Sequence, residues 1–135
     1  MWPPPLFQTR PAAVQLVIAV VIPVAYGALC GAMLGMSAPV FNLLMLVAGI
    51  GGVLGGFEHP TPREGLVRGL VGGTLFAGAL LAMFEARGAA ALTPLPASPP
   101  VMAVIYAVSG PPLGALGGWL RGRSEARRAR ATAAP

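Results

Sequence analysis

The sequence contains no lysine and no aspartate, and it has only one cysteine and one histidine. A single cysteine excludes a disulfide within the chain and any cysteine-rich metal site. Without aspartate, a second histidine or a serine beside a base, the chain offers no catalytic constellation, so we expect no enzyme, no bound metal and no cofactor. Charged residues make up only 10% of the chain, whereas soluble domains carry about 25%. The sequence therefore lacks the charged surface that a soluble domain of 135 residues needs.

Apolar residues, glycine and proline take the place of the missing charge. Hydrophobic residues account for 56% of the chain, and the mean hydropathy is +0.75. Glycine (19 residues) and proline (15 residues) are frequent enough to suggest disorder, but disordered chains are polar. The composition therefore predicts an integral membrane protein.

Four apolar segments reach the length of about 20 residues that a membrane-spanning helix needs. They cover residues 11–35, 39–57, 62–84 and 99–120. Each segment is preceded by a serine or threonine that can cap the helix, and each has a proline in its first turn, where the missing N–H costs nothing. The sequence thus predicts an all-α protein with a four-helix transmembrane domain over residues 11–120, a short N-terminal segment at 1–10 and a basic tail at 121–135.

Arginine placement predicts how the helices cross the membrane. With four spans, both termini and the second loop lie on one side, and eight of the nine arginines lie there too, with Arg87 alone opposite. We therefore expect both termini to be cytoplasmic. Arginine without lysine, among abundant alanine, glycine and proline, is typical of high-GC bacterial genomes, so we expect the bacterial cytoplasmic (inner) membrane. The arginines of the tail are expected to contact anionic lipid rather than nucleic acid.

Glycines recur at intervals of four residues in every predicted span. Spacing of four places them on one helix face, and in lipid such small residues let helices pack closely. The packing candidates are Gly27, Gly31, Gly35, Gly52, Gly56, Gly65, Gly69, Gly73, Gly110, Gly114 and Gly118. They predict a compact glycine-zipper bundle. So much small-residue surface also favours association, either as a homo-oligomer or within a larger membrane complex.

The fourth span carries Ser109, Gly110, Pro111 and Pro112 near its middle. The two prolines lack an N–H and clash with the preceding turn, so we expect the helix to be broken there. Interrupted helices are typical of substrate paths in transporters, but a proline kink can equally serve packing, and both interpretations stay open. Asn42, one turn into the second span, is costly in lipid unless it is hydrogen-bonded. It either lines a polar path or links two helices.

The loop between the second and third spans holds the densest polar cluster. Glu58 and Arg68 lie at or just inside the membrane boundary, where charges are usually paired, so an ion pair between them would hold the two helices together. His59 is the only side chain expected to titrate near neutrality, and with Glu58 it could instead gate a path or relay protons. The absence of a second histidine argues against a metal site here.

Two short segments resemble parts of the small fluoride channels that work as dimers, namely Asn42-Leu43-Leu44 and the run from Gly69 to Thr74. The resemblance does not extend to that family's Thr-Thr-Phe-Ser element, because this chain has Thr74-Leu75-Phe76-Ala77 instead. The arginine bias is also much stronger than the weak charge balance of those channels. We therefore assign no family from it.

Two functions remain open from the sequence. The first is a small oligomeric channel or transporter for a small solute or ion, with Asn42 and residues 109–112 near its path. The alternative is a non-catalytic accessory or assembly subunit of a larger membrane protein complex, with its glycine faces against partner helices. The sequence favours the first. Consecutive prolines destabilise a membrane-spanning helix, and a subunit that only holds a complex together would not need them.

Overall fold

The computed structural model describes residues 5–94 and 98–132, and every regular element in this part of the chain is helical. The order is a 3-10 turn η1 (Phe7–Thr9), α1 (Ala12–Leu16), a π-helical turn η2 (Val17–Val21), α2 (Ile22–Leu34), α3 (Ala38–Phe57), α4 (Pro62–Arg87) and α5 (Pro99–Thr132). Four helical stretches are long and apolar enough to cross a membrane: Ala12–Leu34, which joins α1, η2 and α2, and each of α3, α4 and α5. The prediction of an all-helical, multi-pass membrane protein is confirmed.

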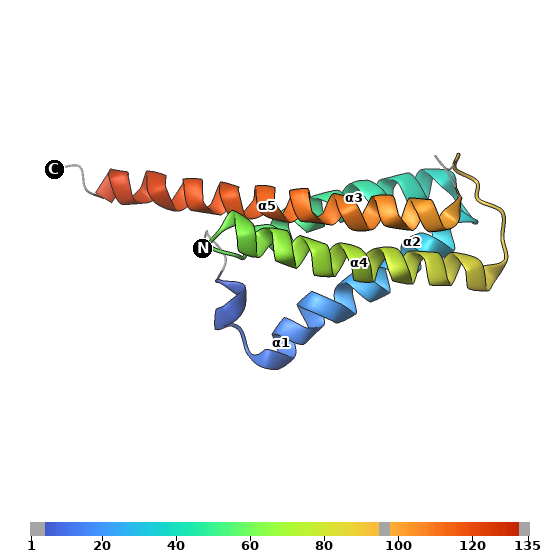
Figure 1. The fold of residues 1–135 in the computed structure, drawn as a ribbon, viewed down its shortest axis with the longest axis horizontal. Helices are drawn as coiled ribbons and strands as arrows, with labels where there is room; N and C mark the ends of the chain where they lie inside the picture. The colour runs from blue at the N-terminus through green and yellow to red at the C-terminus, as the bar shows by residue number, and fades with distance from the viewer. Residues whose placement is uncertain (1–4, 95–97, 133–135) are drawn as a thin grey trace.

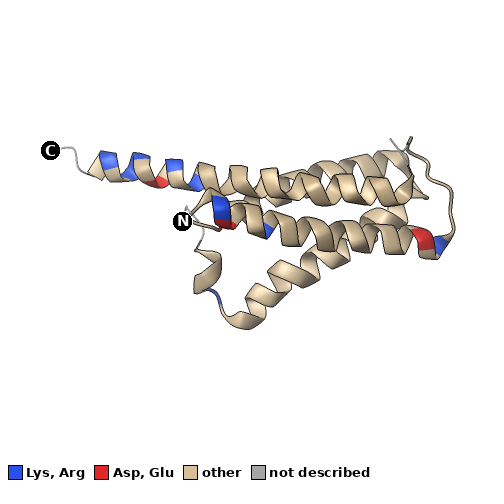
Figure 2. Cartoon of the chain, viewed as in Figure 1, with Lys and Arg blue, Asp and Glu red and all other residues tan. Residues whose placement is uncertain are grey.

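The four spans form an elongated bundle (Figure 1). α4 and α5 run antiparallel beside each other, while α2 packs on α4 and α3 packs on α5. The 3-10 turn η1, the loop between α3 and α4 and the last turns of α5 lie at one end, which we call the arginine-rich end because most arginines gather there (Figure 2). A hydrophobic core joins the four spans toward the opposite end. Its buried residues are Cys30, Leu34, Phe41, Leu80, Phe84 and Met102.

Local sequence signals set both ends of α4. At its start, the Glu64 backbone N–H donates a hydrogen bond of 3.2 Å to Thr61 Oγ1, as predicted for a threonine that caps this helix. At its end, Gly88 follows Arg87 with a φ of 61°, the left-handed conformation that glycine adopts readily after a helix. The helix therefore runs about one turn beyond the predicted span, which ended at Phe84.

The helices approach backbone to backbone at the glycines predicted to mediate packing. Between α4 and α5, a Cβ atom at Gly69 would overlap the carbonyl oxygen of Gly110, and one at Gly65 would overlap that of Gly114. Similar overlaps would occur at Gly27 against Phe76, Gly31 against Leu80, Gly56 against Gly114 and Gly118 against Thr61. The remaining candidates, Gly35, Gly52 and Gly73, lie against Ala89, Leu113 and Ala107. Glycine is required at the tightest of these positions because any side chain would separate the helices.

The expected break in the fourth span is not confirmed. α5 continues through Pro111 and Pro112 and ends only at Thr132. The two prolines remove two helical donors, but α4 lies directly against this segment at Gly110 and holds it in place. With 34 residues, α5 is about 51 Å long at 1.5 Å per residue, whereas the hydrocarbon core is about 30 Å thick. The predicted basic tail is therefore helical as far as Thr132 and projects from the arginine-rich end.

The first span is not one regular α-helix, contrary to the simple span predicted over residues 11–35. In η2, the Ile22 backbone N–H donates to the Val17 carbonyl, five residues back instead of four. Pro23 follows directly and has no N–H to donate. In Figure 1, α1 diverges from α4, whereas α2 packs along it and η2 keeps a smaller contact with it.

Candidate functional site

The N-terminal segment is fastened to the loop between α3 and α4 at the arginine-rich end. The Phe7 backbone N–H donates to the Glu58 carbonyl oxygen at 3.0 Å, and Arg10 Nη2 lies 2.5 Å from Glu58 Oε1. Gln8 Nε2 donates to Glu64 Oε2 at 3.3 Å. We call this set of contacts the N-terminal strap. Glu58 therefore pairs with Arg10 from the N-terminal segment, and the pair predicted between Glu58 and Arg68 is not the one that forms.

His59 is buried beneath the strap and is only 7% exposed. Its ring lies 5.3 Å from the Phe7 ring, centroid to centroid, and its Nδ1 is 3.8 Å from Glu64 Oε2. Neither ring nitrogen has a hydrogen-bond partner among the described residues. Burial lowers the pKa of His59 below its ordinary value; the carboxylates of Glu64 and Glu58 oppose this shift, and the charge of Arg68 adds to it. The imidazole is thus held in its neutral form at neutral pH.

Arg68 points from α4 toward the first span and binds its backbone. Its Nη2 donates to the Ile18 carbonyl oxygen at 2.7 Å. In an α-helix that carbonyl would accept from the Ile22 N–H, but in η2 the Ile22 N–H goes to Val17 instead, so the Ile18 oxygen is available. Gly72 makes the space for the guanidinium, because a Cβ atom there would lie 2.5 Å from Arg68 Nη1. The Arg68 guanidinium therefore gains one hydrogen-bond acceptor from a helix irregularity in another span.

A second arginine, Arg121, joins α5 to the end of α3. It is 5% exposed, and its Nη1 donates to the Phe57 carbonyl oxygen at 3.2 Å. Its Nε donates to Glu125 Oε1 at 2.7 Å, and the guanidinium carbon lies 5.9 Å from the centre of the Phe57 ring. Arg121 thus satisfies a carbonyl at the C-terminus of α3, where the helix dipole favours a positive charge.

Three of the residues predicted to line a path, Asn42, Ser109 and Pro112, are exposed on the outside of the bundle. Asn42 is exposed on α3 and makes no hydrogen bond within the described part of the chain. Ser109 is also exposed, and its hydroxyl donates to the Tyr106 carbonyl of its own helix at 2.7 Å. Pro112 is exposed, whereas Gly110 packs against α4. The structure therefore does not gather these residues into one internal site.

The described residues hold no group of three or more metal-ligating His, Cys, Asp or Glu side chains. Cys30 is fully buried in the hydrophobic core. The polar contacts of the arginine-rich end instead tie segments together: the strap to the α3–α4 loop, α4 to the first span, and α5 to α3.

Sequence reasoning missed three of these contacts. The sequence predicts a topology role for Arg10 and, for Arg121 in the basic tail, contact with anionic lipid as well. Nothing in their spacing points to Glu58 or to the Phe57 carbonyl. The partner of Arg68 depends on a π-helical turn fifty positions away. Pro23 was the one available signal, because a proline inside a span predicts irregular backbone hydrogen bonding before it.

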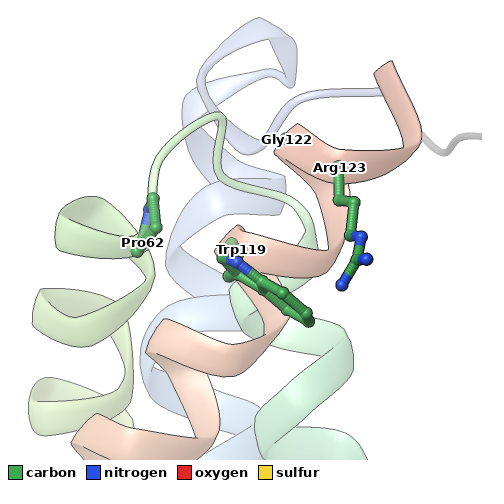
Figure 3. A pocket seen from close by; sticks show the side chains of 5 residues that line it. Pro62, Trp119, Gly122 and Arg123 are labelled. Atoms are coloured by element: carbon green, nitrogen blue, oxygen red, sulfur yellow. The ribbon is translucent and has the colours of Figure 1, made fainter. Parts of the chain in front are cut away.

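An open hollow lies beside the point where α5 leaves the apolar part of the bundle (Figure 3). It measures about 400 Å³ and is lined by Pro62, Gly118, Trp119, Gly122 and Arg123. The Arg123 side chain points back along α5 toward the Trp119 ring, and its guanidinium carbon lies 5.0 Å from the ring centre.

No protein-family model, no curated protein and no solved structure matches this chain.

Proposed function

We propose that the protein is a non-catalytic accessory or assembly subunit of a membrane complex in the bacterial cytoplasmic membrane, with both termini in the cytoplasm. The observation that carries this proposal is the way the bundle interior is filled. At its centre, α4 and α5 touch through Gly65, Gly69, Gly110 and Gly114, so backbone occupies the space that a path within one chain would need. The contacts of the arginine-rich end serve to fasten segments together.

The outer face of α3 supports association with another helix. A Cβ atom at Gly51 or at Gly55 would meet nothing within 4 Å, and these glycines lie four residues apart on one face. Large apolar side chains are exposed on the same helix, among them Leu46, Ile50 and Leu54. In lipid, a glycine pair at this spacing is a typical helix-docking surface. The close approach of helices at glycines within the bundle would thus extend to a partner.

The test is native mass spectrometry of the detergent-extracted protein from its own host at its natural level. We expect stoichiometric co-purification with another membrane protein. The variant Gly51→Leu with Gly55→Leu should lose this partner, because two leucines would block close helix approach. Gly78→Leu is the matched control, since Gly78 on α4 also faces open space. Recovery of the chain without any partner would contradict the proposal.

Transport remains the second candidate, and the exposed Asn42 favours it. An amide on the outer face of an apolar helix is costly in lipid, and a path between identical subunits would hydrate it. A homo-oligomer that conducts ions or small solutes in liposomes, with flux reduced by Asn42→Leu, would establish this function instead. A homo-oligomer without flux would exclude it.

A further inference from the structure

We propose that α5 carries a binding site for an anionic phospholipid, in which Arg123 and Arg127 hold the phosphate and Trp119 supports the glycerol and acyl region. The site lies where α5 leaves the membrane at the arginine-rich end. The inference depends only on the membrane location of the four spans, and it holds whether or not the chain assembles with a partner.

Two adjoining hollows form the site, and both are lined by Trp119 and Arg123. The first, of about 400 Å³, is bounded by the start of α4 at Pro62 and by Gly118 and Gly122 (Figure 3). Gly122 leaves it open, because a Cβ atom there would meet only the Pro60 carbonyl oxygen, at 3.9 Å. The second, of about 550 Å³, continues around the helix, and its lining residues are Phe57, Trp119, Leu120, Arg123, Ser124, Arg127 and Arg128.

The lining of these hollows is positively charged and contains no carboxylate. Glu125, the acidic residue nearest in sequence, is engaged by Arg121 at 2.7 Å. Neither Arg123 nor Arg127 forms an ion pair with a carboxylate in the described part of the chain. The two guanidinium groups therefore have no carboxylate counterion among residues 5–94 and 98–132.

The direction of α5 places these charges at the level of lipid headgroups. Side chains on a helix lean toward its N-terminus, and the N-terminal direction of α5 leads back into the membrane. Arg123 accordingly lies against Trp119, which is 46% exposed, and Leu120 beside it is 38% exposed. Because Trp119, Arg123 and Arg127 are spaced by four, they share one helix face. Trp119 and Leu120 thus provide an apolar surface, and Arg123 and Arg127 provide two positive charges beside it.

An anionic phospholipid matches this arrangement in both of its parts. Guanidinium groups bind phosphate oxygens through paired hydrogen bonds, and tryptophan is favoured at the interface between headgroups and acyl chains. A zwitterionic lipid also carries a phosphate, but its ammonium group offsets the attraction. A soluble phosphate compound would make no use of the exposed Trp119 and Leu120, so the combined surface favours the lipid.

The test is native mass spectrometry of the full chain released from nanodiscs that contain equal amounts of phosphatidylglycerol and phosphatidylcholine. We expect wild-type protein to retain phosphatidylglycerol preferentially. Arg123→Ala with Arg127→Ala should reduce this retention roughly 30-fold, if each arginine near the surface contributes about fivefold. Trp119→Ala should weaken retention while leaving the preference for phosphatidylglycerol over phosphatidylcholine.

The matched control removes two other exposed arginines from the same end, Arg63 and Arg130, which do not line the hollows. Arg63→Ala with Arg130→Ala should retain phosphatidylglycerol like wild type. Equal losses in both double variants would mean that only the total charge matters, and this would overturn the proposed site. Equal retention of the two lipids by wild type would overturn it as well. If inorganic phosphate displaced the lipid, the ligand of this site would be a soluble phosphate compound, and the lipid assignment would be wrong.

Discussion

Adding a single methyl group to α4 should have opposite effects at two glycines of this helix. At Gly69, the new Cβ would overlap the Gly110 carbonyl oxygen of α5. At Gly78, it would meet nothing within 4 Å. Gly69→Ala and Gly78→Ala are therefore chemically identical substitutions in one apolar helix, and they differ only in whether another helix lies against the site.

The magnitudes follow from which atoms must move. A side chain in the way could rotate, but the Gly110 oxygen belongs to the backbone, so α4 and α5 have to separate. Overpacking costs about 1–3 kcal/mol, and a backbone obstacle places Gly69→Ala near 3 kcal/mol. Gly78→Ala should instead stabilise the protein by about 0.5–1 kcal/mol, because alanine loses less conformational freedom than glycine in a helix. The two variants should thus differ by roughly 4 kcal/mol.

The measurement is reversible unfolding in mixed micelles with increasing SDS, followed by far-UV circular dichroism. Gly110→Ala provides a reciprocal check, because its Cβ would overlap the Gly69 carbonyl oxygen. Once one methyl group has separated the helices, the second should cost less, so Gly69→Ala with Gly110→Ala should destabilise by less than the sum of the two. If Gly69→Ala unfolds at the same SDS fraction as Gly78→Ala, the α4–α5 contact described above is wrong.

Three further predictions concern the polar contacts of the arginine-rich end. A double-mutant cycle on Arg10→Ala and Glu58→Gln should show a coupling of about 1.5 kcal/mol, typical of a hydrogen bond between charged groups; additive effects would mean that the strap does not depend on this pair. Gly72→Ala should destabilise the protein by displacing the Arg68 guanidinium, and in an Arg68→Ala background it should no longer do so; an equal cost in both backgrounds would contradict the contact. Because the pKa of His59 is lower in the folded protein, its contribution to stability is fully present above the unfolded value of about 6.5 and is lost as pH falls below it. The free energy of unfolding should therefore decrease on acidification through that range, and His59→Gln should flatten the dependence; an unchanged slope would place the effect elsewhere.

The helical spans were predictable because their signals are local. About 20 apolar residues, a hydroxyl cap and a proline in the first turn are properties of short stretches of sequence, and Thr61 with Glu64 forms its cap as expected. Glycine spacing was similarly informative, because a missing side chain restricts what can lie against a helix face. Gly69 and Gly110 meet for this reason.

The side-chain partners were not predictable because they depend on how the spans are placed in space. Arg68 reaches the Ile18 carbonyl because the path of the first span brings a π-helical turn beside α4. The same path brings Arg10 over the α3–α4 loop, where it reaches Glu58. The prolines of α5 predicted a break in the helix, but α5 continues through them. Proline removes a local hydrogen bond, but the neighbouring helix at Gly110 decides whether the helix ends there.

The uninterrupted course of α5 also has a mechanical consequence. Beyond Leu120 the helix continues for twelve residues to Thr132, about 18 Å at 1.5 Å per residue. A tilt of about 10° within the membrane would therefore shift the far end sideways by roughly 3 Å, and Arg121, held between Phe57 and Glu125, lies close to the pivot. The projecting helix therefore acts as a lever, because a small tilt of its membrane-embedded half becomes a larger sideways movement at its outer end.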